Sequence, residues 1–371
     1  MVLSKIPYKG TRDFFPASMR LREYLFSRMK TAAESFGYEP YDAPLLEEVA
    51  LYRAKSGQEL IDQQIYSFTD RGGRKLAIRP EMTPSLARMV AQIHLEWPKP
   101  IRLYSIPNLY RYERPQRGRV REHWQFNCDI FGENTPYGEM EILQVAIALM
   151  EGLGADDSHF EILLNDRKIV DNIFQKKMGL PCEKAIALMK VLDKTKKVSE
   201  EKLQSMIDEV GLDKNQKKIF NDYINQDGFP NSFKSFTDWA SKAGLKKHIK
   251  YDPSIVRGMD YYTGIIFEIY DKHPDNRRAI AGGGSYEGLM QLFGEPALPG
   301  VGLGMGDVTL QDFIEVHNLK PDFTKPGNDL FLSFQFENCR SEVFQLANTL
   351  RKRKIKVVNC HGILKINKVF S

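Results

Sequence analysis

The stretch IRLYSIPNLYRYERPQRGRVREHWQFNCDIFG, residues 101–132, decides the fold that we expect for this chain. An apolar and aromatic run comes first, an arginine-rich polar stretch follows, and apolar residues then recur at every other position. This pattern predicts two β-strands joined by a long loop. Gly118 gives the loop backbone the freedom to approach a ligand closely. The loop and its edges carry five arginines within eleven residues, namely Arg111, Arg114, Arg117, Arg119 and Arg121.

The arginine-rich loop suits a polyanionic ligand. Guanidinium groups bind phosphate in a planar, two-pronged manner, so the loop fits a nucleotide, a nucleic-acid end, or both. A solvated basic turn is the plainer interpretation of a charge run alone. Arg111 argues against that interpretation, because it lies between Tyr110 and Tyr112 in the first predicted strand, where a cation needs a partner.

The second predicted strand has one regular polar face. Successive side chains in a strand alternate between faces, so alternate residues point the same way. A polar face inside an apolar region predicts that these side chains point into a pocket. The two sets are Gln125, Asn127 and Asp129 on one face, and Phe126, Cys128 and Ile130 on the other.

Length and composition favour a protein of two or three domains. Its 371 residues exceed what one core usually covers. Neither a signal peptide nor an apolar run of membrane-spanning length is found, which predicts a soluble, cytoplasmic protein without a membrane contact. The four cysteines form no C-x-x-C pair, so zinc and a disulfide framework are not indicated.

The net charge of +5 is unevenly distributed. Residues 171–250 hold 16 lysines against 11 acids, and residues 330–371 hold 8 basic residues against 2 acids. The rest of the chain is mildly acidic. Two basic segments on such a protein are typical of one that binds RNA through its peripheral domains, although lysine-rich helical surfaces are also common in other proteins.

Two further junctions carry candidate ligand groups. R-P-E-M-T at residues 79–83 joins a strand to a helix and can present Glu81 and Thr83 to a ligand, although such a helix start is usually only a cap. VRGMDYYTGIIFEIY at residues 256–270 places Arg257 and a tyrosine pair at the mouth of a strand. A structural ion pair and core-filling tyrosines are the plainer alternatives there.

Two glycine-rich segments lie in the second half of the chain. AIAGGGSYEGL at residues 279–289 predicts a strand, a glycine turn and a helix. GVGLGMGDVTL at residues 300–310 predicts an apolar strand that leads to a helix. Near the N-terminus, apolar spacing predicts a helix over residues 17–36 and a strand over residues 38–44.

Four motifs resemble those of class II aminoacyl-tRNA synthetases. RYERPQRGRVREHWQF at residues 111–126 resembles the second signature motif of this class, and E-R-P-Q-x-G-R is similar to that of the bacterial histidyl-tRNA synthetases. VRGMDYY resembles the R-G-x-D-Y-Y signature of the same family, and YEPYDAP with the preceding helix resembles motif 1, which forms a homodimer interface. GVGLGMGDVTL resembles motif 3, with Thr309 where most class II enzymes have an arginine that stacks on adenine.

The resemblance implies an α+β fold, with a class II antiparallel sheet flanked by helices. We expect the first part of the catalytic core over residues 1–166 and its second part over residues 249–320. A helical insertion over residues 167–248 would cover the tRNA acceptor stem. Residues 321–371 resemble a linker and the beginning of an α/β anticodon-binding domain, which we expect to be incomplete and poorly packed beyond about residue 327.

The resemblance also implies the reaction and the site. Histidine would be activated by ATP to histidyl-adenylate and transferred to tRNA, with Mg²⁺ balancing charge through ligands that the sequence does not specify. Arg257 and Arg111 would be catalytic and bind the α-phosphate. The remaining expected contacts are Glu81, Thr83, Gln125, Asp129, Tyr261 and Tyr262 for histidine, Arg119 and Gly304 with the two catalytic arginines for ATP, and Gln116 and Arg117 for the tRNA acceptor end.

Two other functions stay open at this point. The first is a non-catalytic, histidine-binding paralogue such as the regulatory subunit of ATP phosphoribosyltransferase, which Thr309 and the short C-terminal segment favour. Arg257, the arginine-rich loop and the helical insertion argue against it. The second is an RNA-binding module without catalysis, which would leave the grouping of Glu81, Thr83 and Gln125 unexplained.

Overall fold

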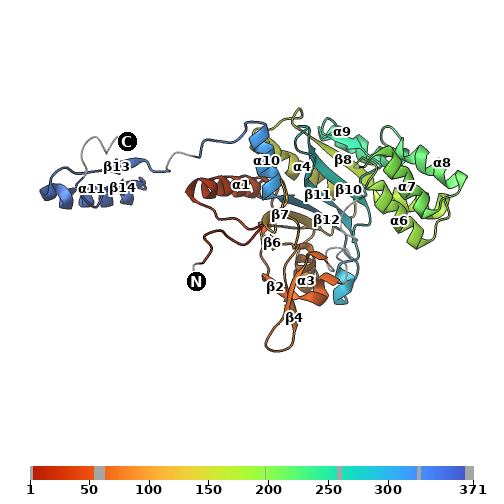
Figure 1. Ribbon diagram of the computed structural model, residues 1–371, viewed down its shortest axis with the longest axis horizontal. Helices are drawn as coiled ribbons and strands as arrows, with labels where there is room; N and C mark the ends of the chain where they lie inside the picture. Colours follow the sequence, from red (N-terminus) through yellow and green to blue (C-terminus); the bar gives the residue numbers. More distant parts are fainter. Residues whose placement is uncertain (1–2, 54–62, 197, 257–260, 324–326, 364–371) are drawn as a thin grey trace. The chain divides into compact units, whose positions relative to one another are not determined.

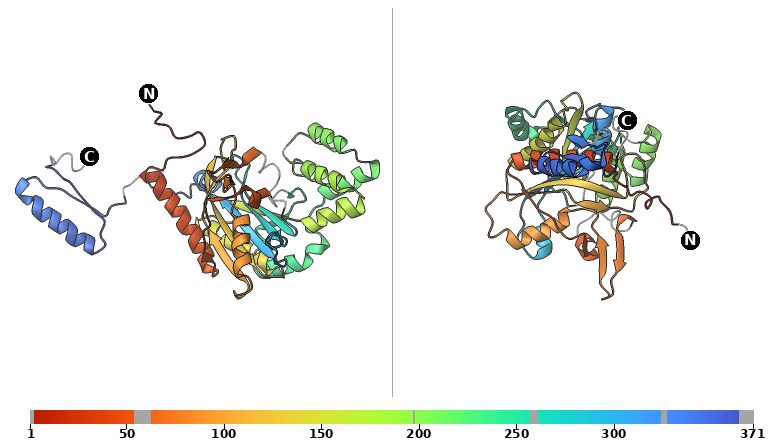
Figure 2. Two further views of the ribbon diagram at one scale, coloured as in Figure 1. Left: turned by 90° about the horizontal axis from the view of Figure 1, so that it is seen from below. Right: turned by 90° about the vertical axis from the view of Figure 1, so that its left-hand side faces the viewer.

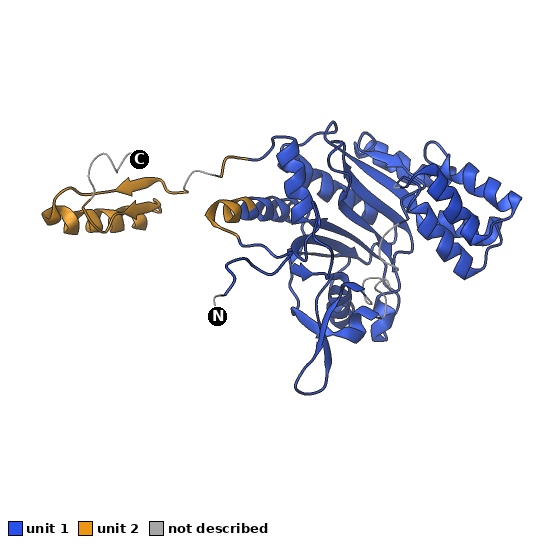
Figure 3. Ribbon diagram, viewed as in Figure 1, with its two compact units in different colours: residues 1–13, 22–320 blue, residues 14–21, 321–371 orange. Residues whose placement is uncertain are grey.

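The computed structural model describes residues 3–53, 63–196, 198–256, 261–323 and 327–363. The chain forms two compact units (Figure 3). Unit 1 comprises residues 1–13 and 22–320, and unit 2 comprises residues 14–21 and 321–371. Unit 1 contains all the predicted site residues, so each unit is described separately.

A nine-stranded sheet forms the centre of unit 1 (Figure 1). Its pairs are antiparallel except for β1 with β5 and β8 with β9. This mixed sheet flanked by helices confirms the predicted α+β class. The strand order is β1 (Glu39–Pro40), β5 (Ile101–Ser105), β7 (Glu122–Phe131), β12 (Gly300–Gly306), β11 (Ala279–Tyr286), β10 (Ile265–Asp271), β8 (Phe160–Asp166) and β9 (Ile249–Tyr251), with β6 (Asn108–Tyr110) paired to β7.

Strand β7 shows the predicted alternation of polar and apolar faces. Phe126, Cys128 and Ile130 are all buried. Residues directly opposite in an antiparallel pair point to the same face. The polar face of β7 therefore shares its side of the sheet with glycines of β12, in the pairs Gly306–Gln125, Gly304–Asn127 and Gly302–Asp129.

The predicted glycine turn at residues 279–289 is wrong. Strand β11 runs through all three glycines, and the expected helix is only the short 3₁₀ turn η4 (Met290–Phe293). The glycines serve close packing between strands, because a Cβ on Gly283 would lie 2.2 Å from the carbonyl oxygen of Gly302. On the pocket face, a Cβ on Gly302 would lie 2.1 Å from Asp129 Oδ1.

The first strand of the predicted hairpin is divided into β5 and β6. Pro107 interrupts it, because proline has no N–H to donate to a ladder. Arg111 therefore follows the end of β6 instead of lying inside a strand. The strand predicted over residues 38–44 is likewise reduced to the two residues of β1.

Helices cover the opposite face of the sheet. Val301, Leu303 and Met305 alternate with the pocket-facing glycines, and all three are buried. Helix α4 (Tyr137–Gly152) packs on this face, where Gly138 lies close to Val301. Helix α10 (Asp307–Val316) follows β12 directly, as predicted, and contacts β7, β11 and β12.

Helices α6, α7 and α8 form a separate group at the β8 end of the sheet (Figure 2). They enclose their own apolar core around Phe174, Leu188 and Phe220. None of the helices in the described part of the chain is long and apolar enough to cross a membrane. The helical segment consists of α5 (Arg167–Asp171), the π-helix η2 (Asn172–Lys177), α6 (Cys182–Leu192), α7 (Glu200–Val210), α8 (Lys214–Ile224), η3 (Asn231–Phe233) and α9 (Lys234–Lys242).

A three-stranded antiparallel sheet leads into the site. Its strands are β2 (Leu46–Glu48), β4 (Lys75–Ile78) and β3 (Tyr66–Thr69), and α2 (Val49–Arg53) packs beside it. Helix α3 (Thr83–Ile93) begins shortly after β4, with Pro84 in its first turn. Proline suits that position because its missing N–H would have no partner inside the helix.

Unit 2 has a small apolar core. Helix α1 (Pro16–Ser35) begins in this unit, where the Arg20 guanidinium donates to the Phe323 carbonyl oxygen. The remainder is β13 (Leu330–Leu332), η5 (Glu337–Cys339), α11 (Arg340–Lys352) and β14 (Val357–Asn359), with β13 and β14 parallel. The βαβ order agrees with the sequence prediction. Large apolar side chains, including Leu330, Phe331, Phe336 and Leu346, stay exposed.

Replacing Gly283 with alanine tests the packing constraint. The new Cβ would clash with the Gly302 carbonyl oxygen and the Phe267 ring, so we expect the free energy of unfolding to fall by about 3 kcal/mol or more. Gly152→Ala is the matched control, because a Cβ there meets nothing within 4 Å. In a helix that substitution should stabilise by about 0.5–1 kcal/mol. Equal urea midpoints for the two variants would show that the close approach is not needed.

Candidate active site

The first cavity lies over the polar face of β7 and has a volume of about 360 Å³. Strands β7, β10, β11 and β12 form its floor, and the start of α3 contributes to its wall. Among the described residues, four carboxylates and two guanidinium groups line this cavity. The charged lining residues are Glu81, Glu113, Asp129, Glu268, Arg111 and Arg119.

Asp129 lines the first cavity and is buried. Its side chain accepts a hydrogen bond of 2.7 Å from the Tyr286 hydroxyl. Tyr261 and Tyr262 stand next to this pair, with ring centroids 5.6 and 6.5 Å from that of Tyr286. Three aromatic rings and a carboxylate thus form a compact pocket that fits a small aromatic or heterocyclic side chain with an N–H donor.

Burial sets the protonation of Asp129. Desolvation raises the pKa of its carboxyl group to about 7, against the opposing effect of the Tyr286 hydrogen bond. The same pocket also raises the pKa of Tyr261 and of Tyr286 by burial. Near neutral pH, Asp129 can therefore change its protonation state when a ligand donates to it.

Glu81 and Thr83, from the strand-to-helix junction, both line the first cavity. Glu81 is buried and accepts a hydrogen bond from the Tyr261 hydroxyl at 3.3 Å. A buried carboxylate beside a hydroxyl at a helix start can hold an ammonium group. Arg79, from the same R-P-E-M-T motif, instead pairs with Asp42 and does not line the cavity.

The second cavity adjoins the first and has a volume of about 620 Å³. The two cavities share Arg111, Arg119, Glu113, Glu268, Gln125, Gly282 and Gly304. Here basic groups outnumber acids, which suits a polyanion. The basic side chains that line the second cavity are Arg111, Arg119, Lys194, Arg277 and Arg278, against the acids Glu113 and Glu268.

Arg111 and Arg119 stand where the cavities meet. The Arg111 Nε donates to the Pro80 carbonyl oxygen at 2.8 Å, which provides the partner that its position required. Arg119 makes a two-pronged ion pair with Glu113. A carboxylate paired in this way occupies the guanidinium face that would otherwise bind phosphate.

The loop between β6 and β7 carries the other predicted contacts. Gln116 and Arg119 form an isolated antiparallel bridge around Gly118, whose φ is +69°. The Arg117 guanidinium donates to Asn276 Oδ1 at 3.2 Å and does not line either cavity. Arg257, the other predicted catalytic arginine, lies outside the described residues.

Several residues of the site were not predicted from the sequence. Tyr286 and Glu268 line the first cavity, and His123, Arg277 and Arg278 line the second. Period-two spacing from Gln125 would have placed His123 on the pocket face. The other four could be found only from the pairing of β10, β11 and β12, which the sequence does not specify.

A buried ion pair supports the second cavity. Asp307, the first residue of α10, pairs with the Arg12 guanidinium at 2.8 Å and accepts from the Trp124 backbone N–H at 3.0 Å. Burial raises the pKa of Asp307, and Arg12 opposes that effect. The pair joins the N-terminal segment to β7 and to the start of α10, so it holds both walls in register.

The antiparallel sheet, its glycine-lined floor and the two adjoining cavities define the catalytic fold of a class II aminoacyl-tRNA synthetase. The solved structure of histidyl-tRNA synthetase from Nostoc sp. PCC 7120 has the same fold, with a TM-score of 0.81 at 18% sequence identity. The superposition covers 100% of this chain and 89% of that one.

Sequence similarity identifies the family within that class. The sequence profile of the histidyl-tRNA synthetases matches residues 10–307. The chain is 42% identical over 361 residues to the histidine–tRNA ligase of Leptospira biflexa, covering 94% of this chain and 82% of that protein. It is 36% identical over 336 residues to the chloroplastic/mitochondrial histidine–tRNA ligase of Arabidopsis thaliana, covering 85% and 67%. The chain belongs to the histidyl-tRNA synthetase family.

The raised pKa of Asp129 gives a test by pH. A carboxyl group whose pKa is higher in the folded state contributes stability below its unfolded pKa of about 3.9. This contribution is lost as pH rises through the folded value of about 7. Relative to Asp129→Asn, the ligand-free wild type should lose on the order of 4 kcal/mol of unfolding free energy between about pH 4 and pH 8. Urea unfolding at several pH values measures this difference, and parallel curves would contradict the buried, protonatable carboxyl.

Proposed function

We propose that this protein ligates histidine to tRNA in two steps through a histidyl-adenylate. The histidine carboxylate attacks the α-phosphate of ATP and releases pyrophosphate, and a hydroxyl of the 3′-terminal adenosine of tRNA then takes the acyl group. The observation that supports this most strongly is the adjoining pair of cavities, one rich in carboxylates and one rich in cations. Their shared wall, at Arg111 and Gln125, is where the two substrates would react.

The first cavity would hold histidine. Glu81 and Thr83 suit the α-ammonium group, while Asp129 suits an imidazole N–H between the rings of Tyr261 and Tyr262. Gln125 lines both cavities from the pocket face of β7 and would contact the carboxylate end of the amino acid, near the shared wall. A ligand that donates to Asp129 favours its charged form, which links histidine binding to loss of a proton from this carboxyl.

The second cavity would hold ATP. Arg111, with Arg257, would neutralise the α-phosphate as charge develops in the transition state, so catalysis would come from positioning and electrostatics. Arg119 would reach the triphosphate by exchanging its carboxylate partner Glu113 for phosphate oxygens. Gly304 carries no side chain and would allow the nucleotide to lie against the strand.

Mg²⁺ would enter with the triphosphate. In the described residues, no group of three or more His, Cys, Asp or Glu side chains could hold a metal ion. Mg²⁺ bound to phosphates needs only one or two protein carboxylates, because water and phosphate oxygens complete its octahedron. Glu113 and Glu268 line both cavities and are suited to this task.

The remaining assignments concern macromolecular partners. Gln116 and Arg117 lie on the loop between β6 and β7, so they would meet the tRNA acceptor end, and the helical segment of residues 167–248 would cover the acceptor stem. Lys194, from this segment, already lines the nucleotide cavity. A homodimer formed through motif 1, an anticodon-binding role for residues 321–371 and a cytoplasmic location stay predictions.

The regulatory, non-catalytic alternative is less well supported by the geometry. A histidine sensor needs the first cavity but has no use for the five basic side chains of the second. Nor does an RNA-binding module need a closed aromatic pocket around Asp129. Histidine-dependent exchange of pyrophosphate into ATP separates the ligase from both alternatives, because it reports adenylate formation alone.

Replacing Arg111 with alanine should lower turnover in the exchange reaction by about a hundredfold or more, because a charge-assisted contact that strengthens in the transition state would be lost. Histidine affinity, measured by calorimetry, should change by less than about threefold. The same pattern is expected for Arg257→Ala.

The control for both variants is Arg74→Ala. Arg74 is an exposed arginine that pairs with Asp70 in the turn between β3 and β4, away from the cavities. Its removal should leave exchange unchanged. Undiminished exchange in the Arg111 variant would contradict the assignment of the shared wall, and absence of exchange in the wild type would favour the regulatory alternative.

A further inference from the structure

A turn of the helical segment forms part of the wall of the second cavity. Helix α6 ends at Leu192, and the chain continues through Asp193, Lys194, Thr195 and Lys196. Lys194 lines the second cavity, although it belongs to the segment that we expect to cover tRNA.

The turn is fixed on both sides of Lys194. The Thr195 hydroxyl donates to the Leu192 carbonyl oxygen at 2.8 Å, which satisfies a carbonyl group that has no partner inside the helix. Lys196 forms an ion pair with Asp252, a residue that is only 4% exposed. The Asp252 backbone N–H donates to the Leu164 carbonyl oxygen of β8 at 2.9 Å, so the turn is attached to the central sheet.

A third cavity, with a volume of about 450 Å³, adjoins the second. Asp193 and Lys196 line the third cavity, whereas Lys194 lines the second. The turn therefore stands between the two cavities and directs its middle lysine to the second. The residues that line both cavities are Glu268, Tyr270 and Arg277.

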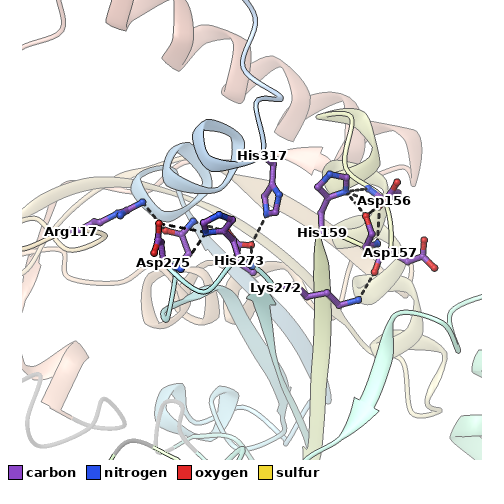
Figure 4. Close-up of polar contacts among 11 residues, drawn as sticks. Arg117, Asp156, Asp157, His159, Lys272, His273, Asp275 and His317 are labelled. Carbon is purple, nitrogen blue, oxygen red and sulfur yellow. Dashed lines mark hydrogen bonds and ion pairs between the residues drawn. The ribbon is translucent and has the colours of Figure 1, made fainter.

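A polar network around Asp271 fixes the segment that follows β10 (Figure 4). Buried Asp271 accepts from the His273 backbone N–H at 2.7 Å and from the Asn276 side chain at 2.6 Å. The His317 ring, at the end of α10, bonds to the same carboxylate at 2.7 Å. Arg117 connects Asn276 to the loop after β6. This Asp271 network holds in place the wall that the second and third cavities share.

The ammonium group of Lys194 is available to a ligand. Its side chain is 49% exposed, and its Nζ lies 4.0 Å from the Asp193 carboxylate, which is too long for a hydrogen bond. A lysine ammonium is a compact charge with three donors on a flexible stem, and it binds phosphate as a point charge. Exchange of the weak Asp193 contact for phosphate oxygens is therefore favourable.

We propose that Lys194 binds the β- and γ-phosphates of ATP, so that the helical segment forms one side of the nucleotide site. The inference rests on the proposed function, because it assigns the pyrophosphate end of the same nucleotide. Arg111 stands at the wall shared with the first cavity, where the α-phosphate would lie. Lys194 is among the described lining residues of the second cavity but not of the first, which suits the phosphates farther from histidine.

Direct binding to the full chain tests the proposal without requiring catalysis. ATP, inorganic tripolyphosphate and AMP, the first two with Mg²⁺, are titrated calorimetrically into the wild type and Lys194→Ala. The variant should bind ATP and tripolyphosphate about tenfold more weakly, the loss expected for one charge-assisted contact. AMP has neither a β- nor a γ-phosphate, so its Kd should stay within about twofold of the wild-type value.

Lys190→Ala is the matched control. Lys190 is exposed in the last turn of the same helix and is not among the described lining residues of the three cavities. Its removal takes one positive charge from α6 and should leave the binding of all three ligands unchanged. Lys194→Arg keeps a cation at the site and should bind ATP within about threefold of the wild type.

Chemical labelling locates the contact in the unmodified protein. Bound tripolyphosphate should slow the reductive methylation of Lys194, measured by mass spectrometry, and should leave the rate at Lys190 unchanged. AMP should protect neither lysine.

Three outcomes would overturn the inference. They are unchanged affinity of Lys194→Ala for ATP and tripolyphosphate, an equal loss of affinity for AMP, and an equal loss in Lys190→Ala. The second would move Lys194 to the α-phosphate, and the third would reduce the effect to the net charge of the helical segment. If the expected binding pattern appears but histidine-dependent exchange is absent in the wild type, the ligase assignment fails and the Lys194 contact stands.

Discussion

The close approach of strands β11 and β12 constrains everything else in the site. A single methyl group on Gly283 would overlap the Gly302 carbonyl oxygen, and one on Gly302 would overlap the Asp129 carboxyl group. Glycine at these positions allows large functional side chains from neighbouring strands to lie over the sheet. Asp129 lies over Gly302 in this way, and Gln125 lies over Gly304. The floor of the site is therefore formed by the backbone of the glycines. Its functional groups are side chains of neighbouring strands that lie over this floor.

The two cavities above this floor differ in the charge of the side chains that line them. The first cavity is lined by carboxyl groups, of which Asp129 has its pKa raised by desolvation. The second cavity is lined by guanidinium and ammonium groups from separate segments, including Lys194 of the helical segment. Glu113 and Arg119 stand at the boundary and neutralise each other. The carboxylate-rich cavity favours a cationic group and the cation-rich cavity favours a polyanion, so the charge pattern distinguishes the two ends of the site.

Period-two spacing predicted β7, its two faces and the pocket position of Asp129, and the segment at residues 300–310 predicted a strand that leads into a helix, as β12 and α10 do. The same local reasoning failed at Gly282, Gly283 and Gly284, because a glycine run is compatible with a turn as well as with close strand packing. Tyr286 is the hydrogen-bond partner of Asp129, yet the two are 157 residues apart in sequence. Only the pairing of β7, β12 and β11 brings them together. Partners of this kind depend on register, which single-sequence patterns do not determine.

The two ends of the site differ in how freely their residues can change. Asp129 is buried and hydrogen-bonded to Tyr286 over a glycine that admits no side chain, so a change at one of these positions leaves another without a partner or without space. In the second cavity, several lining residues come from loops and from the start of α10. The hydroxyl of Thr309 donates to the carbonyl oxygens of Ile280 and Gly306, and the Arg278 side chain lies nearby. The Asp271 network fixes the segment that leads to Arg278 from behind, through α10 and the loop after β6.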